Sequence, residues 1–151
     1  MKTTRYKGAP EEVKALSVYV KLMRASESIS ARIHKPLNEA GLTISQFGVL
    51  EALYHLGPLS QAEIAKKVLK STGNITMVID NLEKRGLVKR HRNEEDRRYY
   101  TIQLTREGEK LTGDIFPRHA ARIMKEMSIL TRAEQDMLGN LCRKLGLQST
   151  T

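Results

Sequence analysis

The strongest chemical signal in the sequence is an aspartate and an arginine two residues apart in a short polar turn. The carboxylate of Asp96 can hold the guanidinium of Arg98 in a fixed orientation through paired, charged hydrogen bonds. A guanidinium at the tip of a turn suits the narrow, electronegative minor groove of duplex DNA, where it senses shape more than sequence. A solvated turn with an incidental ion pair is the usual alternative, and the motifs around this turn argue against it. We therefore predict that Asp96 and Arg98 belong to a DNA-binding site.

A helix that can enter the major groove is predicted just upstream, over residues 71–86. Its apolar residues fall at helical spacing and predict one buried stripe, made of Ile75, Val78, Ile79 and Leu82. Gly86 suits the left-handed conformation that ends such a helix. Polar side chains on the outer face of a helix can meet base edges in the major groove, so this helix is the candidate for sequence recognition.

The outer face of this helix offers hydrogen-bonding groups and one methyl-rich side chain. Asn81 and Thr76 are the best candidates to read base edges, and Met77 can contact thymine methyl groups. Backbone amides near Ser71 and Gly73 can approach a phosphate, aided by the helix dipole. The complete set of predicted DNA-binding residues is Ser71, Thr72, Gly73, Asn74, Thr76, Met77, Asn81, Lys84, Arg90, Arg92, Asp96, Arg97 and Arg98.

The charge of the chain agrees with a polyanionic partner. The net charge is +9, from 26 lysines and arginines against 17 aspartates and glutamates, and seven of the basic residues lie between Lys84 and Arg98. Within that segment Arg90, Arg92 and Arg97 are expected to neutralise phosphates. A basic membrane-binding helix is disfavoured, because the cluster falls largely on a predicted hairpin.

The elements that must position these residues follow one another in the order of a winged helix. Capping boxes are predicted at Thr43, Ser60 and Thr131, each with Glu or Gln three residues further on, and the box at Ser60 begins a supporting helix. A short turn then forces the next helix to cross it. Two strands are predicted over 87–92 and 99–105, on either side of the polar turn. Residues 43–105 are therefore interpreted as a winged helix-turn-helix lobe.

Further helices are predicted on both sides of this lobe, over residues 11–41 and 106–149. Their apolar stripes exceed what a winged helix needs for its own core, so they can pack together or against a second copy of the chain. The predicted fold class is mostly α with a small β-wing. The length of 151 residues suggests a single domain, residues 1–151.

Four segments share the pattern of one bacterial family, namely Ser60–Ala65, Asp80–Val88, Asp96–Arg98 and Leu104–Gly108. Through them the chain resembles the MarR family of winged helix-turn-helix transcription regulators, and the similarity in length and helix order covers nearly the whole chain. The resemblance implies that the terminal helices form a dimerisation domain. It also implies a homodimer that binds double-stranded DNA at a pseudo-palindromic operator and represses transcription until an effector binds, with activation left open.

The resemblance further implies a small aromatic or phenolic effector in a crevice between the dimerisation helices and the DNA-binding lobe. Side chains of suitable type to line it are Arg24 and His34 in the first helix, Phe47 in the second and Phe116 in the fifth. They would make an apolar pocket with one cationic anchor. Core packing or surface solvation explains each of these residues equally well.

Other classes of protein find little support in the sequence. The single cysteine, Cys142, cannot form an intrachain disulfide and fits a reducing cytoplasm, and no apolar run approaches transmembrane length. No motif of an enzyme, a metal site or a cofactor site is visible. Two alternatives stay open. A winged helix used for protein–protein assembly would predict an apolar wing. A redox-responsive regulator would act through Cys142, although the apolar helix face around that thiol favours inert packing.

Overall fold

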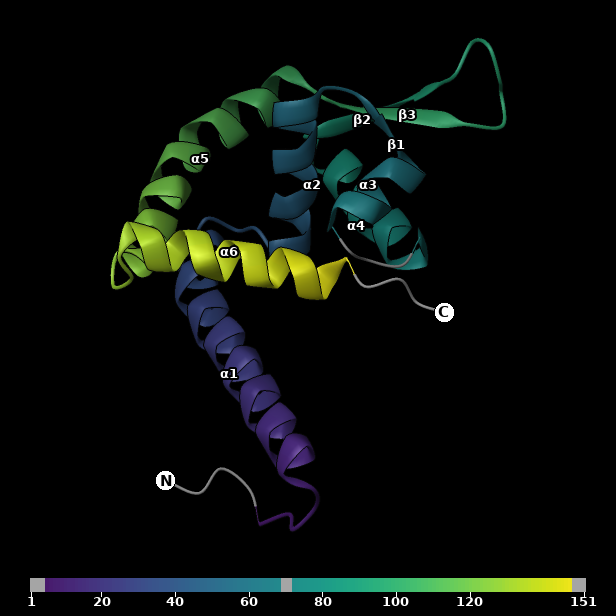
Figure 1. Cartoon of the computed structure of the whole chain (residues 1–151). Helices are drawn as coiled ribbons and strands as arrows, with labels where there is room; N and C mark the ends of the chain where they lie inside the picture. Colours follow the sequence, from purple (N-terminus) through teal and green to yellow (C-terminus); the bar gives the residue numbers. More distant parts are fainter. Residues whose placement is uncertain (1–4, 69–71, 148–151) are drawn as a thin grey trace. The chain divides into compact units, whose positions relative to one another are not determined.

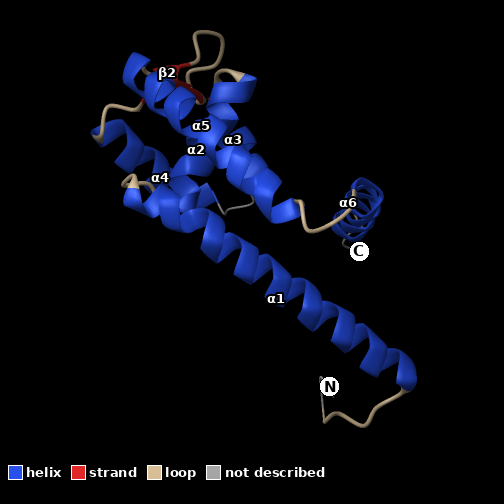
Figure 2. Ribbon diagram, turned by 90° about the vertical axis from the view of Figure 1, so that its left-hand side faces the viewer, coloured by secondary structure: helices blue, strands red, loops and turns tan. Residues whose placement is uncertain are grey.

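The computed structural model describes residues 5–68 and 72–147 of the chain. These residues form mostly helix with one small antiparallel sheet, which confirms the predicted fold class (Figure 1, Figure 2). The chain divides into two compact units, residues 1–113 and 114–151. In chain order the elements are α1 (Pro10–Glu39), α2 (Ile44–Leu56), β1 (Leu59–Ser60), α3 (Gln61–Val68), α4 (Thr72–Lys84), β2 (Val88–Arg92), β3 (Tyr100–Leu104), α5 (Arg106–Met127) and α6 (Arg132–Gly146).

The sheet is a hairpin with a short third strand at its base. Strand order is β1-β3-β2, and all pairs are antiparallel. The hairpin pairs Val88 with Leu104 and Arg92 with Tyr100, while Leu59 of β1 pairs with Ile102 of β3. Figure 1 shows the β2–β3 hairpin, the wing, projecting away from the cluster of α2, α3 and α4. This is the helix, strand, turn, strand order that the sequence predicted for residues 60–105.

The core of the lobe is built where the apolar stripes of the helices meet the inner face of the sheet. Ile75, Ile79 and Leu82 of α4 are completely buried, as are Ile64 of α3 and Ile102 of β3. The three α4 residues were predicted from their helical spacing, and burying each apolar side chain contributes about 1.5–3 kcal/mol. The fourth, Val78, is only half-buried and lies at the edge of the stripe.

Capping side chains begin the helices at the predicted residues. The hydroxyl of Ser60 accepts a hydrogen bond from the amide of Glu63, whose carboxylate accepts one from the Ser60 amide in return. The same reciprocal box stands at Thr43 before α2 and at Thr131 before α6. Each box satisfies amides that a helix N-terminus leaves without partners.

The start of α5 is fixed directly against the base of the wing. The hydroxyl of Thr105 donates to the carbonyl of Gly86 at 2.6 Å and accepts from the amide of Gly108 at 3.1 Å. Gly86 has a positive φ of 73° and turns the chain from α4 into β2. A Cβ on Gly108 would lie 2.0 Å from the Leu87 carbonyl oxygen, so only glycine permits this approach. The two ends of the hairpin are thereby held together.

The terminal helices leave large apolar side chains exposed. No residue of α6, described over its full length, is buried, although Met137, Leu138, Leu141 and Leu145 recur along it at helical spacing. On α1 the side chains of Leu16, Tyr19, Leu22 and Met23 are also exposed. Among the described residues, no helix is long and apolar enough to cross a membrane. Exposed apolar stripes of this kind are typical of interaction surfaces.

Candidate DNA-binding site

One face of α4 is open to solvent because the opposite face is buried. The exposed side chains recur every three or four residues, which places them in one line along the helix: Asn74, Met77, Asn81 and Lys84. Met77 is the most prominent apolar member, with 66% of its surface accessible. All four were predicted to contact DNA. Together they form one exposed edge of α4, and the shape and polarity of this edge suit the major groove.

The other α4 residues that were predicted to bind DNA are Thr72, Gly73 and Thr76. The Thr76 hydroxyl accepts a hydrogen bond from the side-chain amide of Gln61 at the start of α3, and Thr76 is half-buried. This hydroxyl therefore connects the two helices and does not stand in the exposed line as a base-reading group. Thr72 and Gly73 belong to the first turn of α4. Ser71 lies outside the described residues.

At the wing tip, Asp96 and Arg98 form the predicted fork. The Nε and Nη2 atoms of Arg98 donate to the two carboxylate oxygens of Asp96 at 3.1 and 3.0 Å, and the Arg98 amide donates to the same carboxylate at 3.1 Å. The Arg98 side-chain bond, followed by the backbone bond, lowers the pKa of the Asp96 carboxyl below its usual range. The Arg98 side chain remains 84% exposed, so it is oriented without being covered.

Backbone hydrogen bonds give the wing loop a defined shape. The side-chain carbonyl of Asn93 accepts from the amides of Glu95 and Asp96, at 2.8 and 3.3 Å. The Asn93 amide donates to the Tyr99 carbonyl at 2.9 Å, which closes the loop. An asparagine that bonds to the backbone two or three residues ahead imitates a tight turn. The loop therefore presents the Arg98 fork from an ordered base.

Arg92 is also held across the hairpin. Its Nε donates to the Arg97 carbonyl at 3.0 Å, and its guanidinium lies 5.7 Å from the centre of the Tyr100 ring, with which Arg92 is paired in register. Both Arg92 and Arg97 are exposed, as is Lys89. Exposed basic side chains of this kind can neutralise phosphates.

Arg90 differs from the expectation that it neutralises a phosphate. Its guanidinium forms ion pairs with Asp80 at 2.5 Å and Glu83 at 2.9 Å, both on α4, and only 20% of its side chain is accessible. With two carboxylates around one cation, the local charge is not positive. The sequence did not reveal this cluster, because the partners lie seven and ten residues away across a turn whose path the spacing alone does not give.

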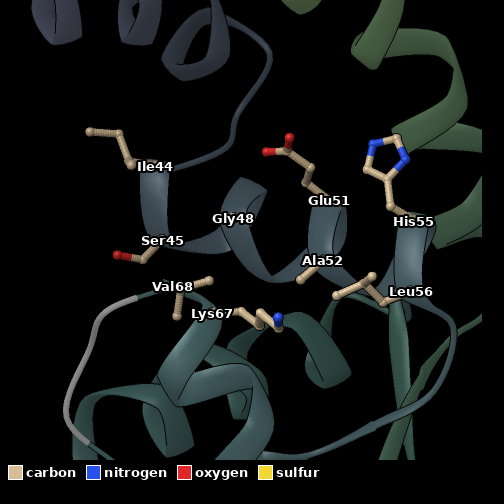
Figure 3. A pocket seen from close by; sticks show the side chains of 9 residues that line it. All are labelled: Ile44, Ser45, Gly48, Glu51, Ala52, His55, Leu56, Lys67 and Val68. Atoms are coloured by element: carbon tan, nitrogen blue, oxygen red, sulfur yellow. The ribbon is translucent and has the colours of Figure 1, made fainter. Parts of the chain in front are cut away.

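A groove lies on the other side of the same lobe, between α2 and α3. Its volume is about 420 Å³ and its lining is mostly apolar, with Lys67 contributing a cationic end. Figure 3 shows Val68 and Lys67 of α3 opposite the face of α2 that carries Gly48 and Ala52. The residues that line the groove are Ile44, Ser45, Gly48, Glu51, Ala52, His55, Leu56, Lys67 and Val68.

None of the four residues predicted to bind an effector lines this groove. Phe47 is only 3% exposed, so its ring packs in the core because its side of α2 is the buried side. Arg24 is exposed on α1, and His34 is half-buried on the same helix. Phe116 belongs to the second unit, where its ring lies 6.3 Å from that of His119. The groove was missed because its lining is shared between two helices, and the spacing of residues along the sequence does not show how those helices pack.

Comparison with known proteins agrees with this geometry. The family model described as "MarR family" matches residues 42–100, from the turn before α2 to the start of β3. The regulator MhqR of Bacillus subtilis is 38% identical over 136 residues, which cover 90% of this chain and 94% of that protein. The chain belongs to the MarR family. It is a DNA-binding transcription regulator with a winged helix-turn-helix fold, and it is not an enzyme.

Solved structures of similar proteins extend the likeness to nearly the whole chain. BpsR of Bordetella bronchiseptica, whose DNA binding is regulated by 6-hydroxynicotinic acid, superposes with a TM-score of 0.78 at 27% identity over 86% of this chain and 98% of BpsR. NadR, in complex with 4-hydroxyphenylacetate, gives a TM-score of 0.75 at 27% identity over 97% of this chain and 99% of NadR.

Three further features bear on alternatives to simple DNA binding in this MarR-family chain. Cys142 is exposed in the chain, whereas its place on an apolar helix face had suggested a packed thiol. Within residues 5–68 and 72–147, no three His, Cys, Asp or Glu side chains gather closely enough to hold a metal ion. The wing surface carries Arg92, Arg97 and Arg98, and this charge opposes an apolar protein-docking role for the wing.

The Asp96–Arg98 fork can be tested by titration. We expect the pKa of Asp96 to lie below its usual range in the wild type and to rise towards it in Arg98→Ala, because the charged hydrogen bonds that favour the carboxylate are lost. A lowered folded-state pKa means that the fork persists at neutral pH and is lost only as the pH falls through that value. Carboxyl-detected NMR titration measures this, with Arg97→Ala as the neighbouring control that leaves the Asp96 pKa unchanged. An equal pKa in the wild type and Arg98→Ala would show that the fork does not form in solution.

Proposed function

We propose that the chain acts in the cytoplasm as a homodimeric repressor that holds a pseudo-palindromic operator and is released by a small aromatic or phenolic acid. The observation that carries the DNA-binding part is the pairing, within one lobe, of an exposed line on α4 with an oriented guanidinium on the wing. The first suits base edges in the major groove and the second suits the adjacent minor groove. Asn74, Met77, Asn81 and Lys84 then face bases and phosphates from the helix, while Arg98 enters the minor groove.

The dimer is supported by the exposed apolar stripes of α1 and α6. We assign residues 11–41 and 106–149 to the dimerisation domain, with residues 43–105 as the DNA-binding lobe. Two lobes related by a two-fold axis meet two half-sites in successive major grooves, which is why the operator is pseudo-palindromic. A dimer seated across a promoter blocks access of the transcription machinery, so occupancy represses and release of the dimer permits transcription.

The groove between α2 and α3 is the proposed effector site. Its volume lies within the usual range for small-molecule pockets, and its lining is mostly apolar, with the charged side chains of Lys67 and Glu51. The apolar part fits an aromatic ring, and Lys67 offers a cation to an acid group on that ring. The regulation of BpsR by 6-hydroxynicotinic acid and the complex of NadR with 4-hydroxyphenylacetate support this class of ligand. Lys67 and Val68, which line the groove, lie at the carboxyl end of α3.

Base reading by α4 is tested with a duplex that the wild-type protein selects from a random-sequence library, and with a scrambled duplex of equal composition. We expect Asn81→Ala to weaken binding to the selected duplex by about 1–3 kcal/mol and to leave the scrambled duplex and the salt dependence unchanged. Arg97→Ala is the matched control, since loss of a phosphate contact should weaken both duplexes alike and lower the salt slope by about one unit. Equal weakening of both duplexes by Asn81→Ala would place that side chain away from the bases.

Dimerisation is tested by sedimentation at micromolar concentration, where we expect the wild type to be a dimer. Leu141→Asp should dissociate or unfold it, because a carboxylate would be buried in an apolar interface without a partner. Asn140→Asp adds the same charge one position along α6 and should keep the dimer intact. A monomeric wild type, or a dimer that tolerates Leu141→Asp, would remove α6 from the interface.

Release from DNA is tested by adding 6-hydroxynicotinic acid or 4-hydroxyphenylacetate to the complex with the selected duplex. At least one of the two should dissociate the wild-type complex. Ala52→Leu should bind the duplex normally but require a much higher concentration of the compound, because the larger side chain fills the groove. Release of the variant at the wild-type concentration would place the effector elsewhere, and no release by either compound would contradict this effector class.

A further inference from the structure

The contact between Arg90 and α4 crosses the junction that joins the recognition helix to the wing. Strand β2 begins a few residues after α4 ends, and the turn between them pivots on Gly86. Arg90 reaches back from the middle of β2 and donates from Nη2 to Asp80 at 2.5 Å and from Nη1 to Glu83 at 2.9 Å. The backbone amide of Arg90 also donates to the Glu83 carboxylate, at 3.3 Å. Three hydrogen bonds therefore tie the centre of β2 to two residues of α4.

Because this contact joins β2 to two residues of α4 at once, it fixes the spacing between α4 and β2 more closely than a single salt bridge would. Asp80 and Glu83 are three residues apart and so lie on the same side of the helix. A guanidinium presents its donors in a rigid planar fork, so one Arg90 side chain can engage both carboxylates only at one distance and one angle between α4 and β2. The other restraints at this junction, namely the apolar core, the Thr105–Gly86 bond and backbone bonds such as Leu87 to Leu82 at 3.0 Å, hold the turn and the base of the hairpin, whereas Arg90 joins α4 to the middle of β2.

The surroundings of Arg90 also argue against a phosphate contact. Only 20% of its side chain is accessible, whereas Asp80 and Glu83 are 47% and 44% accessible. The cluster of one cation and two carboxylates carries a net negative charge, which does not attract DNA. Lys89, the neighbour on the same strand, is exposed and points away from this cluster, because successive side chains alternate along a strand. Two adjacent basic residues of β2 thus stand in different surroundings.

We propose that Arg90 is a positioning residue, which sets the distance between the α4 line of base-reading side chains and the Arg98 fork so that both meet their grooves on the same DNA. This inference rests on the proposed function, since spacing matters only if helix and wing engage one site together. A correct operator needs both contacts in register, whereas random DNA is held through phosphates that tolerate a displaced wing. Arg90 therefore contributes to the preference for operator over random DNA and adds nothing to the salt dependence.

The decisive variant keeps the positive charge at position 90 and removes the planar guanidinium. Arg90→Lys retains one positive charge, but a single ammonium on a flexible stem cannot fix two carboxylates in one geometry. We expect its affinity for the selected duplex to fall roughly tenfold, the equivalent of about 1.4 kcal/mol, with the scrambled duplex within about twofold of the wild type. Arg90→Ala should lose the same preference and leave the slope of log affinity against log salt unchanged. Lys89→Ala, the matched control, should weaken both duplexes alike and lower that slope by about one unit.

Each outcome of this series decides one claim. Should Arg90→Lys behave as the wild type while Arg90→Ala lowers the slope as Lys89→Ala does, Arg90 is an ordinary phosphate contact and the inference is wrong. Equal weakening of both duplexes by Arg90→Lys, with a lower melting temperature, would reduce Arg90 to a general stabiliser and also overturn it. In both cases the wild type still prefers the selected duplex, so the proposed function is not contradicted. Only a wild type that selects no duplex would contradict that function.

Discussion

The burial of one side of α4 is the constraint on which the DNA-binding lobe depends. Ile75, Ile79 and Leu82 are fully buried where α4 packs against α2, α3 and β2. Rotating the helix by one residue position, about 100°, would bring this stripe into water and lose the hydrophobic stabilisation of all three side chains. The helix has therefore only one stable orientation about its own axis. Its remaining exposed face, with Asn74, Met77, Asn81 and Lys84, is directed outward as a consequence.

Polar contacts then fix the position of α4 along its own length, which apolar burial leaves undetermined. Burial of apolar surface has no direction, so it limits rotation of α4 but tolerates small shifts along its length. The Gln61–Thr76 bond fixes α4 relative to α3, and Thr105 joins the α4–β2 turn to α5. Arg90 does the same between α4 and the wing. Partly exposed polar contacts of this kind contribute little to stability individually, so their effect lies in the geometry that they select.

Much of the fold follows from patterns that extend over a few residues. The spacing of apolar residues predicted the stripe of α4, and the capping boxes at Thr43, Ser60 and Thr131 predicted where three helices begin. The Asp96–Arg98 fork was also predictable, because both partners lie within one turn and their bonding needs no distant segment. Local patterns of this kind reflect interactions within one element, which the chain carries wherever that element is placed.

The sequence by itself determined the kind of the main elements, the residues at which three helices begin and the charged character of the wing. Only the tertiary structure decided how individual side chains are used. Thr76 and Arg90 have types suited to DNA, but partners from α3 and α4 engage them, and the ring of Phe47 is taken into the core. The groove between α2 and α3 exists only because two helices leave space beside small residues. A side chain of suitable type contacts DNA or a ligand only when packing leaves it exposed, and packing depends on segments that are distant in the chain.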